Sequence, residues 1–352
     1  MRIGVPKEIK TLEGRVALIP AAAGQLVTEG HEVYVQSGAG RLSGYADEDY
    51  RQSGVQIMPT AKDIYTAAEM IVKVKEPQPE ELELLRADHL LFSYLHLAAA
   101  RELMQVLLDI GLTAVAFETV EHHGQLPLLV PMSDIAGRLA VQIGATLLQQ
   151  PQGGRGVLLG GLPGTPRGHV VILGAGTAGG SAALMASAMG ARVTVFDRSR
   201  DKLAAMRTLG GNVTSLHAYP QAIQDAVLSA DLLVGAILVP GKKATHLVPA
   251  DWVRHMQPGS VIVDIAVDQG GCIETTRPTS YAAPTFVWEE VVHFGVTNMP
   301  GAVPRTASQA LSAVLVPYIL RLAQPGWEQQ SDLQAGINVR AGQILHPALQ
   351  LT

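Results

Sequence analysis

The sequence predicts an α/β protein with mainly parallel sheets, divided into about two domains. Its length of 352 residues suits two domains of roughly 100 to 200 residues each. Short β-branched runs alternate with helical runs in two series, and the pattern changes near Pro131. Such alternation is typical of βαβ units, in which neighbouring strands are parallel. Apolar residues make up 47% of the chain and charged residues 16%, so large cores can be buried.

The first series begins with a strand at 2–5, a helix at 20–29 and a strand at 31–36. Its other segments lie at 57–58, 61–67, 70–74, 90–93, 99–110 and 113–116. A long helix at 135–148 and glycine-rich loops follow, and then strands at 170–173, 192–196, 232–236 and 261–265. A helix at 307–322 precedes a polar tail. The pattern predicts two α/β series, and we place the boundaries of the second, dinucleotide-type domain at 128–304.

Charge and cysteine content argue against several classes of protein. A net charge of -5 without a basic run argues against nucleic-acid binding, which needs clustered Lys and Arg. The single cysteine, Cys272, excludes an intrachain disulfide framework and favours the cytosol. No targeting segment is expected after Met1. Residues 170–191 lack charge, but their glycine pattern fits a cofactor loop better than a membrane span.

A glycine-rich motif, Gly174-Ala175-Gly176-Thr177-Ala178-Gly179, follows an apolar strand and opens a helix. Gly174 permits the tight turn, Gly176 lets a pyrophosphate approach the backbone, and Gly179 lets the helix pack closely on the strand. Amides at the helix N-terminus and the helix dipole favour the phosphate charge. The motif therefore predicts a bound dinucleotide.

Asp197 ends the next strand and predicts which dinucleotide is bound. Its carboxylate can accept both ribose hydroxyls of the adenosine and would repel a 2'-phosphate, so NAD is favoured over NADP. Arg198 and Arg200 leave NADP open, because an arginine here can receive the 2'-phosphate.

Four residues where strands or glycine-rich turns end could carry chemistry. Arg15 could grip a substrate carboxylate or be a surface arginine. Lys75 could bind a ligand at the carboxyl end of a strand or be a solvated lysine. His96 could shuttle protons near neutral pH or be a buried side chain. Asp268, which follows Asp264 into a Gly-Gly turn, could polarise a substrate or cap the turn.

Other motifs are ambiguous or absent. Residues 298–301, Asn-Met-Pro-Gly, form either a loop over the nicotinamide or an ordinary turn. The histidines lack metal-ligand spacing, and the adjacent His122 and His123 would diverge on a strand, so no metal site is predicted. The sequence contains neither a GxSxG nucleophile turn nor a GxxxxGK[ST] loop.

Seven motifs, taken together, are specific. They are residues 2–8 (RIGVPKE), 73–77 (KVKEP), 94–98 (YLHLA), 131–133 (PMS), 136–138 (AGR), 264–272 (DIAVDQGGC) and 298–306 (NMPGAVPRT). Through them the chain resembles the alanine dehydrogenase and transhydrogenase alpha-subunit family nearly from end to end.

The resemblance implies two Rossmann-like, doubly wound domains, joined by helices around a cleft that holds NAD and substrate. Residues 1–127 and 305–352 would form the substrate domain, and residues 128–304 the NAD-binding domain. A cytoplasmic homohexamer is implied, which binds L-alanine, pyruvate and ammonia but neither nucleic acid nor a membrane. The implied reaction is the reversible oxidative deamination of L-alanine to pyruvate and ammonia, with hydride transfer to nicotinamide C4.

The resemblance also implies roles for single residues. Arg15 and Lys75 would hold the substrate carboxylate, and Lys75 would also lie near the reacting carbonyl. His96 would act as acid and base, and Asp268 would position and activate the amine or water. The residues that would border the nicotinamide and substrate are Met132, Ser133, Asn298 and Met299. The other residues that would contact the cofactor are Gly174, Gly176, Thr177, Ala178, Gly179, Asp197, Lys202, Leu238 and Val239, together with Asp268.

Some positions depart from the family pattern. Asp134 stands where glutamate is common, and Thr297 and Gly295 replace the usual alanine and cysteine. Arg198 and Arg200 replace a sequence of Ile-Asn type, and the tail is shorter than usual. These changes could retune the substrate or cofactor without changing the class of reaction.

Two alternatives remain. One is a dehydrogenase for another small amino or imino acid. The other is the NAD(H)-binding subunit of a proton-translocating transhydrogenase, whose relatives tend to replace the acid that is kept here as Asp268.

Overall fold

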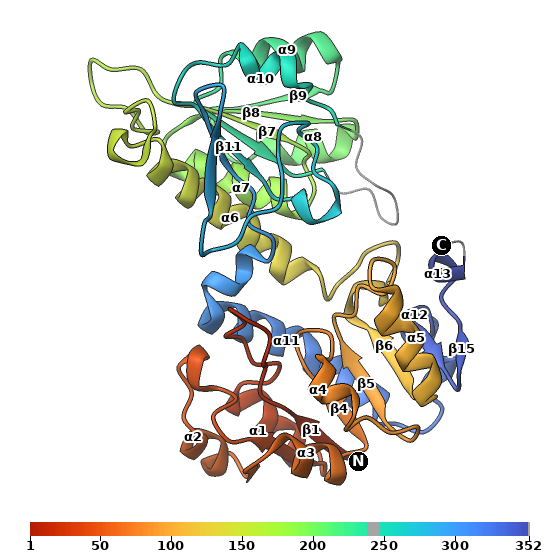
Figure 1. Cartoon of the computed structure of the whole chain (residues 1–352). Coiled ribbons are helices and arrows are strands. Elements are labelled where there is room, and N and C mark those ends of the chain that lie inside the picture. Colours follow the sequence, from red (N-terminus) through yellow and green to blue (C-terminus); the bar gives the residue numbers. More distant parts are fainter. Residues whose placement is uncertain (238–245, 351–352) are drawn as a thin grey trace. The chain divides into compact units, whose positions relative to one another are not determined.

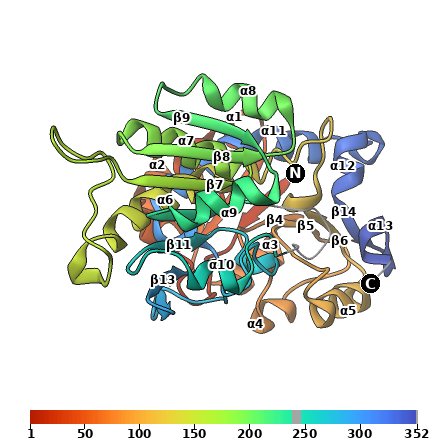
Figure 2. The same ribbon diagram turned by 90° about the horizontal axis from the view of Figure 1, so that it is seen from above.

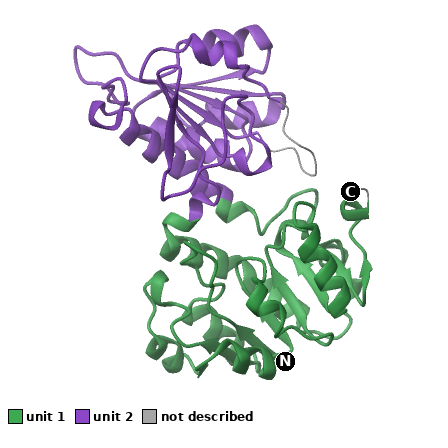
Figure 3. Cartoon of the chain, viewed as in Figure 1, with its two compact units in different colours: residues 1–132, 301–352 green, residues 133–300 purple. Residues whose placement is uncertain are grey.

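Two sheets organise the chain, one in each of two units (Figure 3). The structure is a computed structural model that describes residues 1–237 and 246–350. Unit 1 comprises Met1–Met132 and Gly301–Thr352, and unit 2 comprises Ser133–Pro300. The boundaries between the units lie a few residues from those predicted from the sequence, at 127/128 and 304/305. Helix α6 (Val130–Leu147) crosses the first boundary, and 3-10 helix η5 (Met299–Ala302) crosses the second.

The sheet of unit 1 has eight strands in the order β15-β14-β6-β5-β4-β1-β2-β3. Its strands β6, β5, β4 and β1 follow one another in Figure 1. Their bounds are β1 Arg2–Val5, β2 Glu32–Gln36, β3 Gln56–Met58, β4 Met70–Val72, β5 Leu90–Ser93, β6 Thr113–Ala116, β14 Ile337–Arg340 and β15 Gln343–Ile344. Strands β1 to β6 pair in parallel. Since strand order runs outward in both directions from β1 and β4, the sheet is doubly wound, with its switch point between these strands.

Helices connect these strands and cover the sheet. They are α1 Pro20–Thr28, α2 Asp47–Gln52, α3 Ala61–Ala67, α4 Pro79–Leu82, α5 Arg101–Ile110, α11 Pro304–Leu322, α12 Ser331–Gly336 and α13 Pro347–Gln350, with 3-10 helices η1 Arg41–Ser43, η2 Phe117–Thr119 and η6 Trp327–Gln329. Local signals explain several starts. For example, Pro20 opens α1, and Thr60 and Asp63 form a capping box at α3.

The polar segment after residue 322 is folded as part of unit 1. Strand β14 pairs antiparallel with β6 and extends the sheet of unit 1. Ile337 and Val339 are buried in this strand. Asn338 between them is also buried, and its side-chain oxygen accepts a hydrogen bond from the Thr119 hydroxyl at 2.9 Å. A polar residue at position 338 suggests an exposed segment, because its partner Thr119 is distant in the sequence and cannot be seen in the local pattern.

The sheet of unit 2 has seven strands in the order β12-β13-β11-β10-β7-β8-β9. Their bounds are β7 His169–Leu173, β8 Arg192–Asp197, β9 Val213–His217, β10 Leu232–Gly235, β11 Val261–Asp264, β12 Thr285–Trp288 and β13 Val291–Phe294. All neighbours are parallel except β12 and β13. Strands β7, β8 and β9 lie side by side in Figure 2. The switch point lies between β7 and β10, next to the glycine-rich loop. The predicted α/β class with mainly parallel sheets is confirmed.

Strands β9, β12 and β13 were not among the predicted strands. Strand β9 is an edge strand in which Val213 is the one buried residue, so it has little of the apolar pattern that marks a core strand. Strand β12 is likewise an edge strand. Its neighbour in the sheet is β13, to which a short turn connects it.

The helices of unit 2 pack closely through small residues. They are α6 and α7 Thr177–Ala188, α8 Arg200–Arg207, α9 Pro220–Leu228 and α10 Ala250–Arg254, with 3-10 helices η3 Gln150–Gln152 and η4 Val267–Gln269. A Cβ added at Gly137 of α6 would overlap the carbonyl oxygen of Ala178 in α7. The Ser181 hydroxyl also donates to Asp134 Oδ1 at 2.6 Å. Helix α6 starts at Val130 rather than residue 135, and a proline in the first turn is compatible with this start.

We expect Gly137→Ala to lower the free energy of unfolding by about 2 kcal/mol, because overpacking costs more than the roughly 1 kcal/mol of helix propensity that alanine gains. Chemical denaturation measures the change. Gly211→Ala is the control, because an added Cβ there has nothing within 4 Å. Equal stability of the two variants would contradict the close packing of α6 on α7.

Candidate functional site

The glycine-rich loop connects β7 to α7 at the switch point of unit 2. Gly174 has a φ of 99°, which favours glycine. A Cβ at Gly176 would have nothing within 4 Å, whereas one at Gly179 would overlap the Gly174 carbonyl oxygen. Helix α7 begins without a side-chain cap, so its first amides can receive a phosphate. The loop has the open surface and backbone donors that a dinucleotide pyrophosphate needs.

Asp197 lies at the end of β8 and braces this loop. Its Oδ2 accepts a hydrogen bond from the Ala175 amide and its Oδ1 one from the Ser199 amide, both at 2.8 Å. A carboxylate has about four acceptor positions, so it can still accept ribose hydroxyls. Lys202, on α8, is exposed. Leu238 and Val239, predicted to lie beside the cofactor, fall outside the described residues.

Arg15 is buried and oriented by Glu13 in unit 1. Its Nε and one Nη donate to the two Glu13 carboxylate oxygens at 2.7 and 2.6 Å. The other Nη lies 3.2 Å from Met132 Sδ. Burial alone would raise the pKa of Glu13, but the hydrogen bonds and charge of Arg15 lower it below its ordinary value. Thus Glu13 holds a permanent cation in place beside Met132, another of the predicted substrate residues.

Residues from α11 hold the loop that carries Arg15. The Ser308 hydroxyl accepts from the Val16 amide at 2.9 Å. The Ser312 hydroxyl accepts from the Ile19 amide and donates to the Ala17 carbonyl, both at 3.0 Å. The position of Arg15 therefore depends on a helix almost 300 residues later in the chain (separations of 292 to 295 residues).

Lys75 follows β4 and is half-buried near Arg15. Burial lowers its pKa below the ordinary value for lysine, and the positive charge of Arg15 lowers the pKa further. Two neighbouring positive charges favour the binding of an anion, because both attract its negative charge. The structure thus brings Arg15, Lys75 and Met132 together in unit 1.

His96 follows β5 and has a φ of 51°, a strained value for a residue with a Cβ. The Glu118 carboxylate holds this backbone. It accepts from the Leu95 amide at 3.2 Å and the His96 amide at 2.5 Å, and one of its oxygens lies 3.9 Å from His96 Nδ1. Half of the His96 side chain is exposed (50%). The imidazole is therefore accessible, while a carboxylate near Nδ1 can orient it.

The ring of Tyr94 links His96 to Arg15. It lies parallel to the imidazole, with centroids 6.0 Å apart, and the Arg15 charge acts on its hydroxyl. Burial raises the pKa of Tyr94 far above its ordinary value, so the phenol stays protonated and donates to the Leu128 carbonyl at 2.6 Å.

Asp268 is exposed on η4, and Asp264 organises the loop around it. The Asp264 carboxylate accepts from the Ala266 amide at 3.1 Å and the Cys272 amide at 3.0 Å, so it joins both ends of the loop. Burial raises the pKa of Asp264 to about 6, although these hydrogen bonds lower it. The sequence left two roles open for Asp264 and Asp268, polarising a substrate or capping the turn. In the structure Asp264 caps the turn. The catalytic role of Asp268 remains a prediction.

Ser133, Asn298 and Met299 lie near the two chain crossings between the units. Asn298 has a φ of 59° and is half-buried, and Met299 is buried. The Met299 carbonyl accepts from the Tyr281 hydroxyl at 3.0 Å. Ser133 is half-buried on α6. Their contacts with a cofactor remain predictions.

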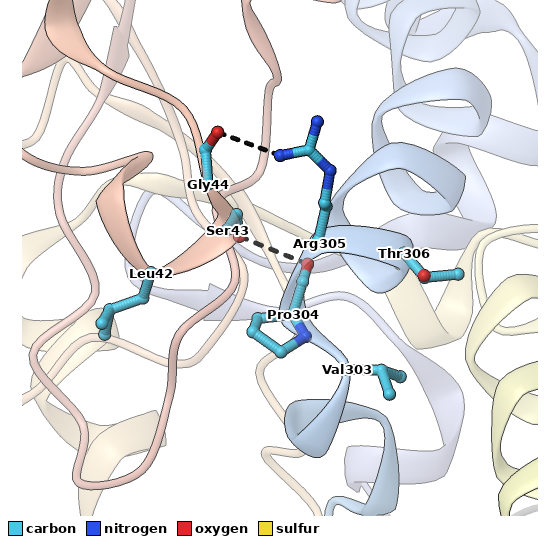
Figure 4. A pocket seen from close by; sticks show the side chains of 7 residues that line it. All are labelled: Leu42, Ser43, Gly44, Val303, Pro304, Arg305 and Thr306. Carbon is cyan, nitrogen blue, oxygen red and sulfur yellow. Dashed lines mark hydrogen bonds between the residues drawn. The ribbon is translucent and has the colours of Figure 1, made fainter.

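Two pockets, one in each unit, are lined by residues other than those predicted to bind substrate or cofactor. One, of about 400 Å³, is formed in unit 1 by Leu42, Ser43, Gly44, Val303, Pro304, Arg305 and Thr306 (Figure 4). In it the Arg305 side chain donates to the Gly44 carbonyl at 3.0 Å. The other, of about 440 Å³, is formed in unit 2 by Pro166, Arg167, Arg192 and Asn212.

Two further classes of site are not found in the described part of the chain. Across residues 1–237 and 246–350, no three His, Cys, Asp or Glu side chains come together as metal ligands. In the same ranges, none of the helices has both the length and the apolar character needed to cross a bilayer.

Sequence reasoning missed Glu13, Tyr94 and Glu118. Tyr94 precedes His96 by two positions at the end of a strand, and this spacing could have placed both on one face. Glu118 carries no such signal, because its contact with His96 joins the ends of two different strands, β5 and β6.

Comparison with known proteins identifies the family. Residues 4–136 match the family described as Alanine dehydrogenase/PNT, N-terminal domain, and residues 140–347 match Alanine dehydrogenase/PNT, C-terminal domain. The chain belongs to the alanine dehydrogenase/PNT family. Alanine dehydrogenase of Bacillus subtilis (strain 168) is 48% identical, with 99% of this chain and 94% of that protein covered. Alanine dehydrogenase of Mycolicibacterium smegmatis is 46% identical, with 99% and 96% covered.

Solved structures of the family agree with the fold. A structure described as L-alanine dehydrogenase is 54% identical, with a TM-score of 0.96. The match covers 100% of this chain and 98% of the chain in that structure. A structure of transhydrogenase from Sinorhizobium meliloti is 25% identical, with a TM-score of 0.86 and coverage of 99% and 100%. The alanine dehydrogenase and the transhydrogenase thus share this fold, and the alanine dehydrogenase is much more similar in sequence.

We expect the buried Asp264 to make stability depend on pH. Its folded pKa of about 6 lies above the ordinary value of 3.8, so the folded state binds a proton more tightly than the unfolded chain does. This contribution is complete below pH 4 and is lost as pH rises through 6, at a cost of roughly 3 kcal/mol. Asp264→Asn cannot ionise, so its unfolding free energy relative to wild type should rise between pH 4.5 and 7. Parallel denaturation curves for the two proteins across this range would refute the assignment.

Proposed function

We propose that this chain catalyses the NAD-dependent, reversible oxidative deamination of L-alanine to pyruvate and ammonia. Similarity to alanine dehydrogenases over the whole chain supports the reaction. The observation that carries the substrate side is the pair of neighbouring cations Arg15 and Lys75, the first buried and oriented by Glu13. Such a pair suits a small carboxylate at the end of a parallel sheet.

Arg15 and Lys75 bind the substrate carboxylate in this proposal. The guanidinium is always charged and is oriented by Glu13, so it supplies fixed direction, whereas the ammonium of Lys75 supplies a point charge. Met132, which contacts the Arg15 guanidinium, offers an apolar surface for the methyl group. This combination fits a short, carboxylate-bearing substrate such as alanine or pyruvate.

His96 and Asp268 handle protons and charge at the reacting carbon. Positive charge develops at the substrate nitrogen as the hydride leaves, and the Asp268 carboxylate stabilises it. His96 accepts a proton from the attacking water and returns it to the departing ammonia. Glu118 favours this role because its carboxylate lies 3.9 Å from Nδ1, and it can orient the ring as the proton moves.

The cofactor belongs to unit 2. Members of this family act with pyridine nucleotides, and the bound nicotinamide supplies the acceptor for the substrate hydride. We propose NAD rather than NADP, because the Asp197 carboxylate at the end of β8 would repel a 2'-phosphate. The loop from Gly174 to Gly179 offers backbone amides to the pyrophosphate, and exposed Lys202 can reach toward the ribose.

The second candidate is a nucleotide-binding subunit of transhydrogenase, which the shared fold favours. Such a module needs the nucleotide loop but neither a substrate-binding pair of cations nor an acid such as Asp268. The presence of both sets of residues supports the dehydrogenase.

Assembly and compartment are proposed on less specific grounds. We propose a homohexamer, as is usual in the family, and exposed Leu158 and Leu162 in unit 2 are suitable for a subunit interface. A cytoplasmic location fits the single cysteine, Cys272, which is free and buried.

Loss of NADH absorbance with pyruvate and ammonium tests the proposed reaction. We expect oxidation that requires both substrates, prefers pyruvate among 2-oxo acids of increasing side-chain size, and prefers NADH to NADPH. A preference for a larger acid would favour another amino-acid dehydrogenase. NADH binding without turnover for any acid would favour the transhydrogenase subunit.

His96→Ala and Asp268→Ala should each reduce kcat for alanine deamination by about 10²- to 10⁴-fold, as loss of acid-base or electrostatic catalysis does. Circular dichroism should be unchanged, since both side chains are exposed. His255→Ala is a matched control, because that exposed histidine (62%) belongs to no predicted site and should retain wild-type kcat. A His96 or Asp268 variant with near wild-type kcat would remove that residue from the mechanism.

A further inference from the structure

A buried cluster of charges lies beside Lys75 in unit 1. The Lys73 side chain is 0% exposed, and its Nζ lies 3.1 Å from Glu8 Oε2 and 3.2 Å from Glu81 Oε2. Both carboxylate side chains are 3% exposed. These three residues form the Lys73 cluster. Burying charges is costly even when they are paired, so a gain in stability is a weak explanation of this cluster. Its contacts with neighbouring backbone groups offer a better one.

The cluster grips the backbone of Lys75 from two directions. Glu8 Oε1 accepts from the Val74 amide at 2.6 Å and the Lys75 amide at 3.3 Å. Lys73 Nζ donates to the Lys75 carbonyl at 3.0 Å. Strand β4 ends at Val72, so Lys75 lies beyond the regular ladder, and these side chains replace the strand partners that would otherwise hold it.

Glu81 anchors the other end of the cluster. It accepts from the Tyr65 hydroxyl at 3.1 Å and from the Gln78 amide at 2.8 Å, the latter at the start of α4. The cluster therefore joins the segments after β1 and β4 to α4. Each of its members contacts either the Lys75 peptide or a group that does.

We propose that Lys73, Glu8 and Glu81 are positioning residues that direct the Lys75 ammonium toward the substrate carboxylate. The proposal rests on the substrate-binding role proposed above for Lys75. The two lysines have different roles in this proposal. Lys75 contacts the substrate, and Lys73 acts only through the backbone of Lys75.

The protonation of the cluster agrees with this division. Burial lowers the pKa of Lys73, but the charges of Glu8 and Glu81 outweigh this and raise it above its ordinary value. Burial raises the pKa of Glu8; the Lys73 charge opposes this, and the charge of Glu81 raises it further, because two carboxylates share one ammonium. Lys73 therefore remains a cationic donor that cannot act as a base.

Two substitutions disturb the cluster in different ways. Glu8→Gln keeps one oxygen for the Val74 amide but places an amide N–H against Lys73, and Lys73→Met removes the donor to the Lys75 carbonyl. We expect KM for pyruvate to rise about tenfold for Lys73→Met and roughly threefold or more for Glu8→Gln, because a lost or weakened charged contact has this effect on binding. The Kd for NADH, measured by fluorescence, should stay within twofold of wild type. If Lys73→Met fails to fold, Glu8→Gln decides the matter.

Asp332→Asn is the matched control for simple loss of stability. Asp332 forms a partly buried ion pair with Arg321 in the same unit, with contacts of 2.5 and 2.7 Å, and it makes no contact with the Lys73 cluster among those described. This variant should lower the melting temperature and leave KM for pyruvate unchanged. The same rise in KM in the control, or a KM within twofold of wild type in a folded cluster variant, overturns the proposal.

Chemical reactivity of Lys75 provides a test that does not depend on turnover. Burial lowers the pKa of Lys75 and the charge of Arg15 lowers it further, so a Lys75 that moves away from this position should have a higher pKa and less of the reactive neutral amine at pH 8. Brief acetylation at pH 8, read by peptide mass spectrometry, should label Lys75 about threefold less in the cluster variants, which equals a shift of about half a pKa unit. Unchanged labelling in both variants overturns the positioning role. If wild type has no activity with alanine while labelling changes as expected, the proposed function fails and the positioning of Lys75 stands.

Discussion

Parallel pairing of β1, β4 and β5 is the constraint on which the substrate-side residues depend. Because these strands are neighbours in the same direction, their carboxyl ends meet at one edge of the sheet. Arg15 follows β1, Lys75 follows β4 and His96 follows β5. Three residues that are far apart in sequence therefore share one edge, and any loss of this register would separate the cations from the imidazole.

Buried or half-buried carboxylates perform a common task in both units. Glu8, Glu118 and Asp264 each accept hydrogen bonds from at least two backbone amides of the loop that carries a candidate residue. These loops lie beyond the ends of strands, where the sheet no longer provides partners. A charged acceptor forms stronger hydrogen bonds to amides than a neutral one does, so each carboxylate can hold a loop that would otherwise be mobile.

Unit 2 achieves its geometry with small residues instead. Gly179 permits α7 to approach the Gly174 carbonyl, and Gly137 permits α6 to approach α7. The result is a helix whose uncapped N-terminus and open Gly176 surface are available to an anionic ligand. Unit 1 thus holds the charged residues Arg15 and Lys75, whereas unit 2 combines exposed backbone donors with the carboxylates of Asp197 and Asp268.

The sequence by itself determined the α/β class, and its glycine spacing predicted a nucleotide loop followed by Asp197. Local pattern was sufficient for these because periodicity, glycine spacing and strand ends are properties of short segments. For Arg15, Lys75, His96 and Asp268 the local pattern left two interpretations each, and only the family resemblance implied their roles. Only the tertiary structure revealed strands such as β9 and β14, in which exposure at an edge or a buried Asn338 obscures the apolar pattern.

Tertiary structure also decided what surrounds each candidate. Arg15 depends on Ser308 and Ser312 of α11, and His96 depends on Glu118 after β6. Lys73 and Lys75 lie two residues apart in one motif, and the structure shows that Lys73 is a buried ion-pair partner whereas Lys75 is the cation beside Arg15. Partners of this kind are chosen by strand order and helix packing, which no local segment encodes.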